Sequence, residues 1–256
     1  MPFPKPLTGR TALITGASSG IGEHLAQAIS KAGARVALGA RRTDRTEALA
    51  SGLRELGGEA LAVPLDVTDD ASVVAAFDAA ERAFGTVNTI IANAGTAGGG
   101  RSTDVDPAAV RSVLDTNLLG VYLTAREGAK RLIAADSRVN EIGRIILIGS
   151  ITAGMTGQGD AAYAASKAGV AHLGRQFARE WVRQGINVNT VQPGYIQTEL
   201  TGGWFDSEGG EAQVAGWHRR RLMDIDSLDD IMLFLCSDAS RFVTGATFTI
   251  DDGQSL

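Results

Sequence analysis

Short apolar runs rich in β-branched residues alternate along this chain with longer segments that have helical length and periodicity. Seven of the short runs are predicted to be strands: residues 11–15, 35–38, 60–65, 89–92, 144–148, 186–191 and 246–250. The stretch 145–148 is apolar at every position, which is typical of a strand buried on both faces of a parallel sheet. Because strands that alternate with helices indicate βαβ units, the pattern predicts an α/β fold.

The alternation runs through the whole chain without a repeat, a low-complexity segment or a linker that would divide it. We therefore expect one domain over residues 1–256, a doubly wound Rossmann fold with a seven-stranded parallel sheet flanked by helices. Helices are expected to begin near Asp106-Pro107 and near Ser227, which precedes Asp229 and Asp230.

Composition excludes several classes of protein. Lys plus Arg number 24 against 29 Asp plus Glu, and a net charge of −5 is the wrong sign for a dedicated nucleic-acid binder. The single Cys236 and the three dispersed histidines (His24, His172 and His218) offer neither a disulfide framework nor a metal site. Because neither a signal peptide nor a membrane segment is recognisable, a cytoplasmic protein without membrane partners is expected.

A glycine-rich turn follows the first predicted strand. Gly16 would permit the tight turn, Gly20 would let a pyrophosphate approach the backbone, and Gly22 would let the following helix pack closely on the strand. The chain holds 32 glycines in 256 residues, about 12% against a usual share of roughly 7%. The turn predicts a dinucleotide site, with a merely flexible turn as the alternative.

The end of the second predicted strand indicates which dinucleotide binds. An NAD enzyme would present a carboxylate there, whereas this chain has Arg41 and Arg42, which suit bidentate capture of a 2′-phosphate. NADP is therefore favoured over NAD as the cofactor. The alternative is that both arginines only form a solvated start to the next helix.

Tyr163 and Lys167 stand four residues apart in a helical segment, which places them one turn apart on one face. The phenol of tyrosine has an ordinary pKa of about 10, and a nearby ammonium together with an oxidised nicotinamide would favour the phenolate. Ser150 lies at the end of a buried strand, where its hydroxyl can hold a carbonyl oxygen. Taken alone, the Tyr–Lys spacing also fits an ordinary helix-face pair.

Together these motifs resemble the short-chain dehydrogenase/reductase family over residues 9–253. Residues 15–22 match its T-G-x3-G-x-G turn, 93–95 its N-A-G segment, and 193–194 its post-strand turn. Ser150, Tyr163 and Lys167 match its catalytic serine and its Y-x3-K pair. The resemblance implies Asn117 as a fourth catalytic residue, which braces the helix and a proton-relaying water; alternatively, this asparagine only satisfies neighbouring backbone.

The resemblance also implies cofactor contacts: Asp66 and Val67 to the adenine, Ile196 and Thr198 to the carboxamide. The basic residue that some NADP-using members carry inside the glycine turn is absent, since Ser18 and Ser19 stand there. The full set of expected cofactor residues is Gly16, Ser18, Ser19, Gly20, Ile21, Gly22, Arg41, Arg42, Asp66, Val67, Asn93, Ala94, Gly95, Tyr163, Lys167, Pro193, Gly194, Ile196 and Thr198.

Residues 194–221 mix glycines with aromatic side chains, so we expect a substrate lid at about 195–221. The substrate residues expected are Met155, Tyr195, Trp204 and Phe205, although the aromatic ones also fit plain lid packing. Arg219, Arg220 and Arg221 indicate a solvated face or a contact to a phosphorylated substrate. The ending Asp251-Asp252-Gly253 departs from the frequent family ending D-G-G.

The predicted activity is NADPH-dependent, reversible reduction of a fairly apolar ketone to a secondary alcohol by hydride transfer. One alternative is a 3-oxoacyl-thioester reductase, which would need a basic surface for a carrier. An alternative of another class is an NADP-binding sensor or scaffold without turnover. The resemblance implies a homodimer or homotetramer whose main dimer face comprises residues 107–135 and 162–183.

Overall fold

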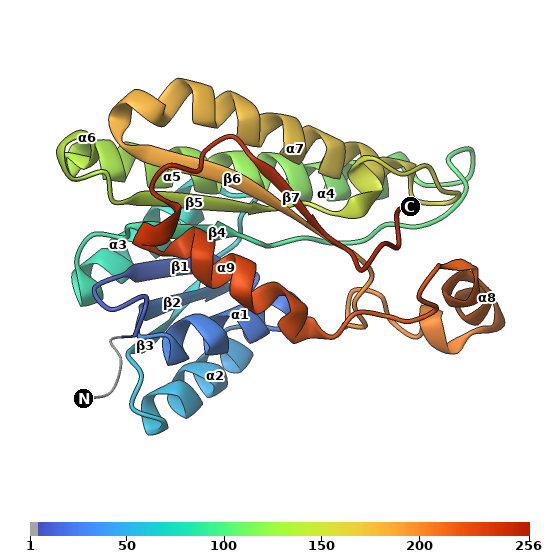
Figure 1. Cartoon of the computed structure of the whole chain (residues 1–256), viewed down its shortest axis with the longest axis horizontal. Helices are drawn as coiled ribbons and strands as arrows, with labels where there is room; N and C mark the ends of the chain where they lie inside the picture. The colour runs from blue at the N-terminus through green and yellow to red at the C-terminus, as the bar shows by residue number, and fades with distance from the viewer. Residues whose placement is uncertain (1–4) are drawn as a thin grey trace.

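Seven parallel strands form the centre of the molecule in the order β3-β2-β1-β4-β5-β6-β7 (Figure 1). The structure is a computed structural model and describes residues 5–256. The strands are β1 (Thr11–Thr15), β2 (Arg35–Ala40), β3 (Ala60–Pro64), β4 (Thr89–Ala92), β5 (Gly143–Ile148), β6 (Ile186–Pro193) and β7 (Thr247–Ile250). The strand order reverses between β1 and β4, and open α/β sheets place ligands at such a point.

Helices cover both faces of the sheet (Figure 1). The helices α1 (Gly20–Lys31), α2 (Thr43–Glu55) and α9 (Asp229–Cys236) contribute to one core, and α3 (Asp70–Phe84), α5 (Gly120–Ala134) and α7 (Ala161–Trp181) to the other. The remaining helices are α4 (Pro107–Leu114), α6 (Ser137–Asn140) and α8 (Glu208–Gly216), with a π-turn at Asp115–Leu119 and 3₁₀ turns at Ile151–Ala153, Val182–Gln184, Trp204–Asp206, Ile225–Leu228 and Asp238–Ser240.

Alternation along the strands builds the two cores. In β1, Leu13 faces the core under α3 and α5, whereas Ile14 faces the core under α1 and α9. Both side chains are fully buried, and each such burial stabilises the fold by roughly 1.5–3 kcal/mol. A rigid sheet with both faces covered is thus fixed beneath the strand ends that carry the functional groups.

The seven predicted strands and the doubly wound arrangement are confirmed. The helix start at Asp106-Pro107 is also confirmed, because the Asp106 carboxylate accepts a hydrogen bond of 2.8 Å from the amide of Ala108. The helix expected near Ser227 is also present. Helix α9 begins at Asp229, directly after a 3₁₀ turn in which the Ser227 hydroxyl donates to the carbonyl of Asp224.

The predicted lid segment is irregular, with the 3₁₀ turn Trp204–Asp206 followed by helix α8, which extends away from the sheet (Figure 1). Residues 1–4 of the expected domain, which also carry part of the argument against a signal peptide, lie outside the described residues. Within residues 5–256, no helix has the length and apolar character needed to cross a membrane.

Candidate active site

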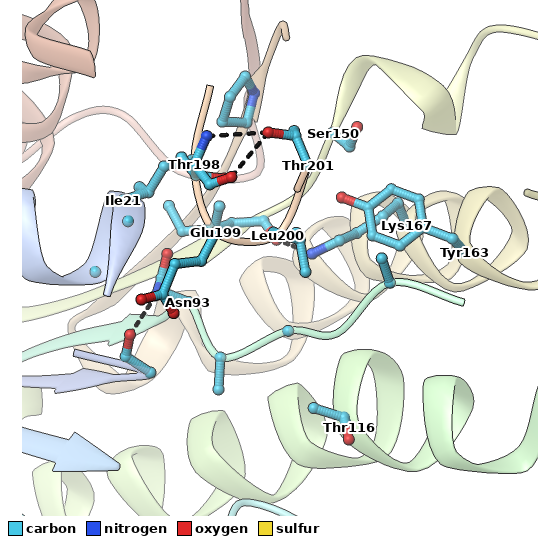
Figure 2. Close-up of a pocket in the computed structure, with 18 of the residues that line it drawn as sticks. Ile21, Asn93, Thr116, Ser150, Tyr163, Lys167, Thr198, Glu199, Leu200 and Thr201 are labelled. Carbon is cyan, nitrogen blue, oxygen red and sulfur yellow. Dashed lines mark hydrogen bonds between the residues drawn. The ribbon is translucent and has the colours of Figure 1, made fainter. Parts of the chain in front are cut away.

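A cavity of about 850 Å³ opens at the carboxyl ends of the strands, beside the point where the strand order reverses. The glycine turn after β1 and the ends of β2 and β4 line one part of it; the ends of β5 and β6, the start of α7 and the lid line the rest. Segments that are far apart in the sequence therefore share one pocket, as Figure 2 shows for ten labelled residues.

The glycine turn is shaped by close backbone contacts. Gly16 has φ +69°, and a Cβ there would lie 2.8 Å from the Cα of Ala94. A Cβ on Gly22 would lie 2.4 Å from the Gly16 carbonyl oxygen, so larger residues do not fit at either position. No side chain among residues 5–256 caps helix α1 at Ser19. The N–H groups of its first turn face the cavity and suit an anion.

The N-A-G segment acts as a brace for this turn. The Asn93 side-chain amide donates to the carbonyls of Thr15 at 2.9 Å and of Gly16 at 3.4 Å. The Thr15 hydroxyl in turn accepts from the amides of Asn93 and Ala94, each at 3.0 Å. Asn93, Ala94 and Gly95 line the pocket, and the Asn93 side chain connects the loop after β4 to the glycine turn.

Arg42 lies at the N-terminus of α2 and reaches back to the glycine turn. Its Nε donates to the Ser18 hydroxyl at 3.1 Å, and its Nη2 donates to the Ser19 hydroxyl at 2.6 Å. Its Nη1 donates to the carboxylate of Glu199 at 2.8 Å. Both Arg41 and Arg42 are exposed and line the pocket, so neither guanidinium is excluded from a bound ligand.

Asp66 and Val67 line the pocket beyond the end of β3. The Asp66 carboxylate accepts from the amide and the hydroxyl of Thr68, at 3.0 and 2.8 Å, and these bonds lower its pKa. Arg41 lowers this pKa further by its charge. Asp66 is therefore ionised and fixed in orientation.

Ser150, Tyr163 and Lys167 converge at the other end of the pocket (Figure 2). Ser150 ends the β5 segment, and the Thr152 hydroxyl donates to its oxygen at 3.0 Å. Lys167 runs past the tyrosine ring, with its Nζ 5.6 Å from the ring centroid, and donates to the carbonyl of Ile148 at 3.0 Å. The one-turn spacing predicted for Tyr163 and Lys167 thus brings a phenol and an ammonium to one site.

Burial dominates the ionisation of this group. It raises the pKa of Tyr163 above its ordinary value, and only a hydrogen bond with Ser150 acts in the opposite direction. Burial also lowers the pKa of Lys167 to about 8. The expectation that an ammonium together with an oxidised nicotinamide favours the phenolate concerns the chain with its cofactor bound, and it stays a prediction.

Asn117 is fully buried and does not line the pocket. Its Oδ1 accepts from the amide of Thr96 at 2.8 Å, and its Nδ2 donates to the Thr96 carbonyl at 2.9 Å and to the Ser166 hydroxyl at 3.3 Å. Ser166 donates in turn to the carbonyl of Tyr163 at 2.6 Å. Asn117 therefore connects the loop after β4 to α7 from within the π-turn, a local geometry that sequence periodicity did not reveal.

The lid contributes an aromatic wall. Tyr195 stacks on Trp217 with centroids 5.3 Å apart and meets Phe205 edge-on at 5.6 Å. Tyr195, Trp204 and Phe205 line the pocket as expected for substrate residues. Met155, also expected as a substrate residue, follows the turn Ile151–Ala153 and is not among the residues that line the cavity, so its contact with a substrate stays a prediction.

The base of the lid is tied to the C-terminus. Pro193, Gly194, Ile196 and Thr198 all line the pocket. The buried Gln254 side chain accepts from the amide of Tyr195 at 2.6 Å, and a Cβ on Gly194 would lie 2.4 Å from its oxygen. Gln254, in the unusual chain ending, thus fixes the first residues of the lid.

Arg219 and Arg221, two of the three arginines noted in the sequence, also connect the lid to the C-terminal segment. Asp252 pairs with Arg219 at 3.1 Å and with Arg221 at 2.7 Å. The Asp252 carboxylate thus holds two of the three arginines and offsets one of their three positive charges. Among residues 5–256 no ion pair involves Arg220, so the cluster keeps a net positive charge.

The sequence reasoning missed two carboxylates in the pocket wall, Asp160 and Glu199. Asp160 precedes α7, and its side chain makes neither a cap nor an ion pair with any residue between 5 and 256. Its charge raises the pKa of both Tyr163 and Tyr195. In the sequence, the only feature that pointed to Asp160 is its position three residues before Tyr163.

Comparison with known proteins gives the same picture. The sequence model of a family described as Enoyl-(Acyl carrier protein) reductase matches residues 16–255. The cis-4-hydroxycyclohexanecarboxylate dehydrogenase of Sinomonas cyclohexanicum is 36% identical over 247 residues, covering 96% of each chain. The 3-oxoacyl-[acyl-carrier-protein] reductase FabG of Escherichia coli is 32% identical over 250 residues, covering 97% of this chain and 98% of that protein.

A solved structure agrees with these sequence relatives. The gluconate 5-dehydrogenase of Burkholderia cenocepacia, in complex with NADP and tartrate, superposes with a TM-score of 0.92 at 32% identity and covers 98% of this chain and 97% of that one. Family match, relatives and fold agree over nearly the whole length. The chain belongs to the short-chain dehydrogenase/reductase family, whose members are oxidoreductases that use a nicotinamide cofactor.

Proposed function

We propose that this chain reduces a ketone to a secondary alcohol with NADPH, and that it also runs in the opposite direction. The observation that carries the proposal is the placement of Ser150, Tyr163 and Lys167 at one end of a cavity whose other end is a glycine turn with free N–H groups. A dinucleotide that spans such a cavity brings its nicotinamide to these three side chains. A phosphate suits the turn, because the start of α1 has no side-chain cap and lines the cavity.

Each side chain has a role in this reaction. The bound nicotinamide supplies the hydride that reaches the carbonyl carbon. Ser150 holds the carbonyl oxygen with its hydroxyl, and Tyr163 donates its proton to that oxygen. Since burial keeps the Tyr163 pKa high, the phenol is protonated at neutral pH and ready to act as an acid. In the oxidative direction the phenolate would take the proton, which requires a positive charge nearby.

Lys167 provides that charge and also holds the ribose of the nicotinamide. It is nearly fully buried and donates to the Ile148 carbonyl, so it is fixed beside the tyrosine ring. Asn117 is a positioning residue: it fixes the start of α7 through Ser166 and keeps Tyr163 in place. These roles explain why a buried ammonium is retained despite its cost.

The preference for NADP over NAD rests on Arg42, with Arg41 beside it. The Arg42 guanidinium lies between the glycine turn and the end of β2, where the adenosine ribose would lie, and it already binds oxygen acceptors there. A guanidinium in this place favours a 2′-phosphate. The relative crystallised with NADP is consistent with this cofactor.

The substrate side of the cavity favours a fairly apolar, uncharged ketone. Tyr195, Trp204 and Phe205 form one wall. Asp160 contributes a carboxylate to the same side, and it repels substrates that carry a carboxylate of their own. We therefore expect neutral alcohols and ketones to be better substrates than hydroxy acids or keto acids.

An absorbance assay with NADPH and with NADH, over a panel of aliphatic, aryl, steroidal, acidic and thioester ketones, tests cofactor and substrate class together. We expect oxidation of NADPH with neutral ketones, and slower oxidation of NADH. Failure to oxidise either cofactor with any ketone would favour a sensor or scaffold that binds the dinucleotide without turnover.

A 3-oxoacyl-thioester reductase is the second candidate, since one relative carries that name and the matching family is described by a carrier-linked activity. Its carrier would need an unpaired basic surface near the pocket. Arg219 and Arg221 share the single carboxylate of Asp252, which reduces the basic charge available to a carrier and makes this the second candidate. Thioester and neutral ketones in the same assay separate the two.

We also propose that two or four copies of the chain assemble and that they work in the cytoplasm. The proposed dimer face over 107–135 and 162–183 carries exposed apolar side chains: Leu114, Leu119 and Tyr122. Their burial would favour association. Light scattering of the purified protein gives the assembly directly.

A further inference from the structure

The lid is linked to the adenosine end of the pocket by one carboxylate, Glu199. Its Oε2 accepts from Arg42 at 2.8 Å, and its Oε1 accepts from Arg45 at 2.5 Å. The hydrogen bonds and charges of both arginines lower the Glu199 pKa to about 2. Glu199 is therefore an anion that is held by two cations of α2, 154 and 157 positions away in the sequence.

Each of the three guanidinium nitrogens of Arg42 makes a hydrogen bond in this arrangement. Its three nitrogens donate to Ser18, Ser19 and Glu199, one acceptor each. The two serine hydroxyls are neutral and can turn to donate to a phosphate. The Glu199 carboxylate has no proton to donate, and it carries the same sign of charge as the phosphate.

Glu199 also lines the pocket itself. The segment 198–201 forms a closed turn in which the Thr201 hydroxyl donates to the Thr198 carbonyl at 2.9 Å, and it borders the pocket (Figure 2). A Cβ on Gly20 would lie 3.3 Å from the Thr198 side chain, so this turn packs directly on the glycine turn. The carboxylate and an incoming 2′-phosphate therefore compete in one small region.

We propose that Glu199 is a cofactor-selectivity residue: its carboxylate, held by Arg42 and Arg45, competes with the 2′-phosphate of NADP(H) for Arg42. This inference rests on the proposed assignment of Arg42 to the cofactor. A cofactor with a 2′-hydroxyl does not have to displace the carboxylate. Glu199 thus reduces the ratio by which the arginines raise the affinity for NADPH over that for NADH, so that NADH can still bind.

The expected effect is moderate, because the side chains of Glu199, Arg42 and Arg45 are each about half exposed. Exposed ion pairs of this kind change an equilibrium by up to about 5-fold each. With two pairs involved, removal of the carboxylate charge is expected to change the discrimination by about 3- to 10-fold.

The test compares adenosine 2′,5′-bisphosphate with adenosine 5′-monophosphate by calorimetry, because these probes report the 2′-phosphate without nicotinamide or turnover. The proteins are the wild type, Glu199→Gln and a matched control, Glu47→Gln, which removes a carboxylate that pairs with Arg54 on the outer side of α2. We expect the preference for the bisphosphate to rise about 3- to 10-fold in Glu199→Gln and to stay unchanged in Glu47→Gln.

Every outcome decides something. A preference that is unchanged or reduced in Glu199→Gln overturns the competition, and the wild-type preference then shows separately whether the NADP assignment survives. If the wild type has no preference and Glu199→Gln gains one, the competition holds and the proposed NADP preference is wrong. If the control gains as much as Glu199→Gln, the effect is general surface charge and the inference fails.

Discussion

The charged side chains at the two ends of the pocket differ in exposure and in pairing. At the end that holds Arg42 and Glu199, charged side chains are about half exposed, and opposite charges are paired at 2.8 Å. At the end that holds Tyr163 and Lys167, the ammonium is nearly fully buried without a carboxylate partner among the salt bridges of residues 5–256, and its pKa is lowered to about 8. Exposed pairs are exchangeable and suit ligand selection, whereas a buried, perturbed group suits proton transfer.

The largest effect is expected at the buried end. Tyr163→Phe removes the proton donor and should lower kcat by a factor of about 10³, while the affinity for NADPH changes by less than about 2-fold. Steady-state rates and fluorescence titration with NADPH measure the two quantities. Tyr122→Phe, the same change on α5 outside the cavity lining, is the control for catalysis. Retention of more than a few per cent of activity would reject Tyr163 as the proton carrier.

The second prediction uses pH. Between pH 8 and 10.5 the folded chain has released the Lys167 proton and the unfolded chain has not, so the wild type should gain stability as pH rises through this range. Relative to Lys167→Met, the gain should approach about 3 kcal/mol. Denaturant unfolding at several pH values measures it, with Lys31→Met as the control. A constant difference between wild type and Lys167→Met would mean that burial does not perturb this lysine.

The third prediction addresses the exposed end. Arg42→Ala should weaken NADPH binding by about 10-fold, since charge-assisted hydrogen bonds of a guanidinium contribute roughly 1.5–3 kcal/mol and part of this is offset by release of Glu199. NADH binding should change by less than about 3-fold. Arg54→Ala, on the same helix, is the control. Equal losses for both cofactors would show that Arg42 only supports the turn.

The smallest effect concerns the substrate side. Asp160→Asn removes one carboxylate from the cavity wall, so the kcat/KM for a keto acid should rise about 3-fold relative to that for its methyl ester. Asp206→Asn, a carboxylate of the lid that does not line the cavity, is the control. If the ratio between acid and ester does not move, Asp160 does not contact the part of the substrate that carries the charge.

Most of the fold followed from local signals. The seven strands were predictable because buried apolar runs and the helices between them leave one sheet arrangement, and the glycine turn was predictable because Gly16 and Gly22 have no room for a side chain. Tyr163 and Lys167 could be placed on one face because helix periodicity is regular. These features depend on neighbours in the sequence.

The remainder depended on contacts between distant segments. The pairing of Glu199 with Arg42 and the anchoring of Tyr195 by Gln254 join residues that no spacing rule connects. The high pKa of Tyr163 also escaped prediction, because burial depends on how α7 and the lid pack and not on the Tyr–Lys spacing. Whether Met155 lines the cavity also depends on how the turn Ile151–Ala153 folds, which the sequence pattern did not show.

The account as a whole depends on direct transfer between the cofactor and the substrate carbon at the buried end of the pocket. The most direct measurement is reduction of a neutral ketone by the wild-type chain with NADPH that carries deuterium at both hydrogen positions of C4 of the nicotinamide. Mass spectrometry of the alcohol should find the deuterium at the carbinol carbon. Alcohol formed without the label, with the deuterium lost to water, would contradict the proposed chemistry.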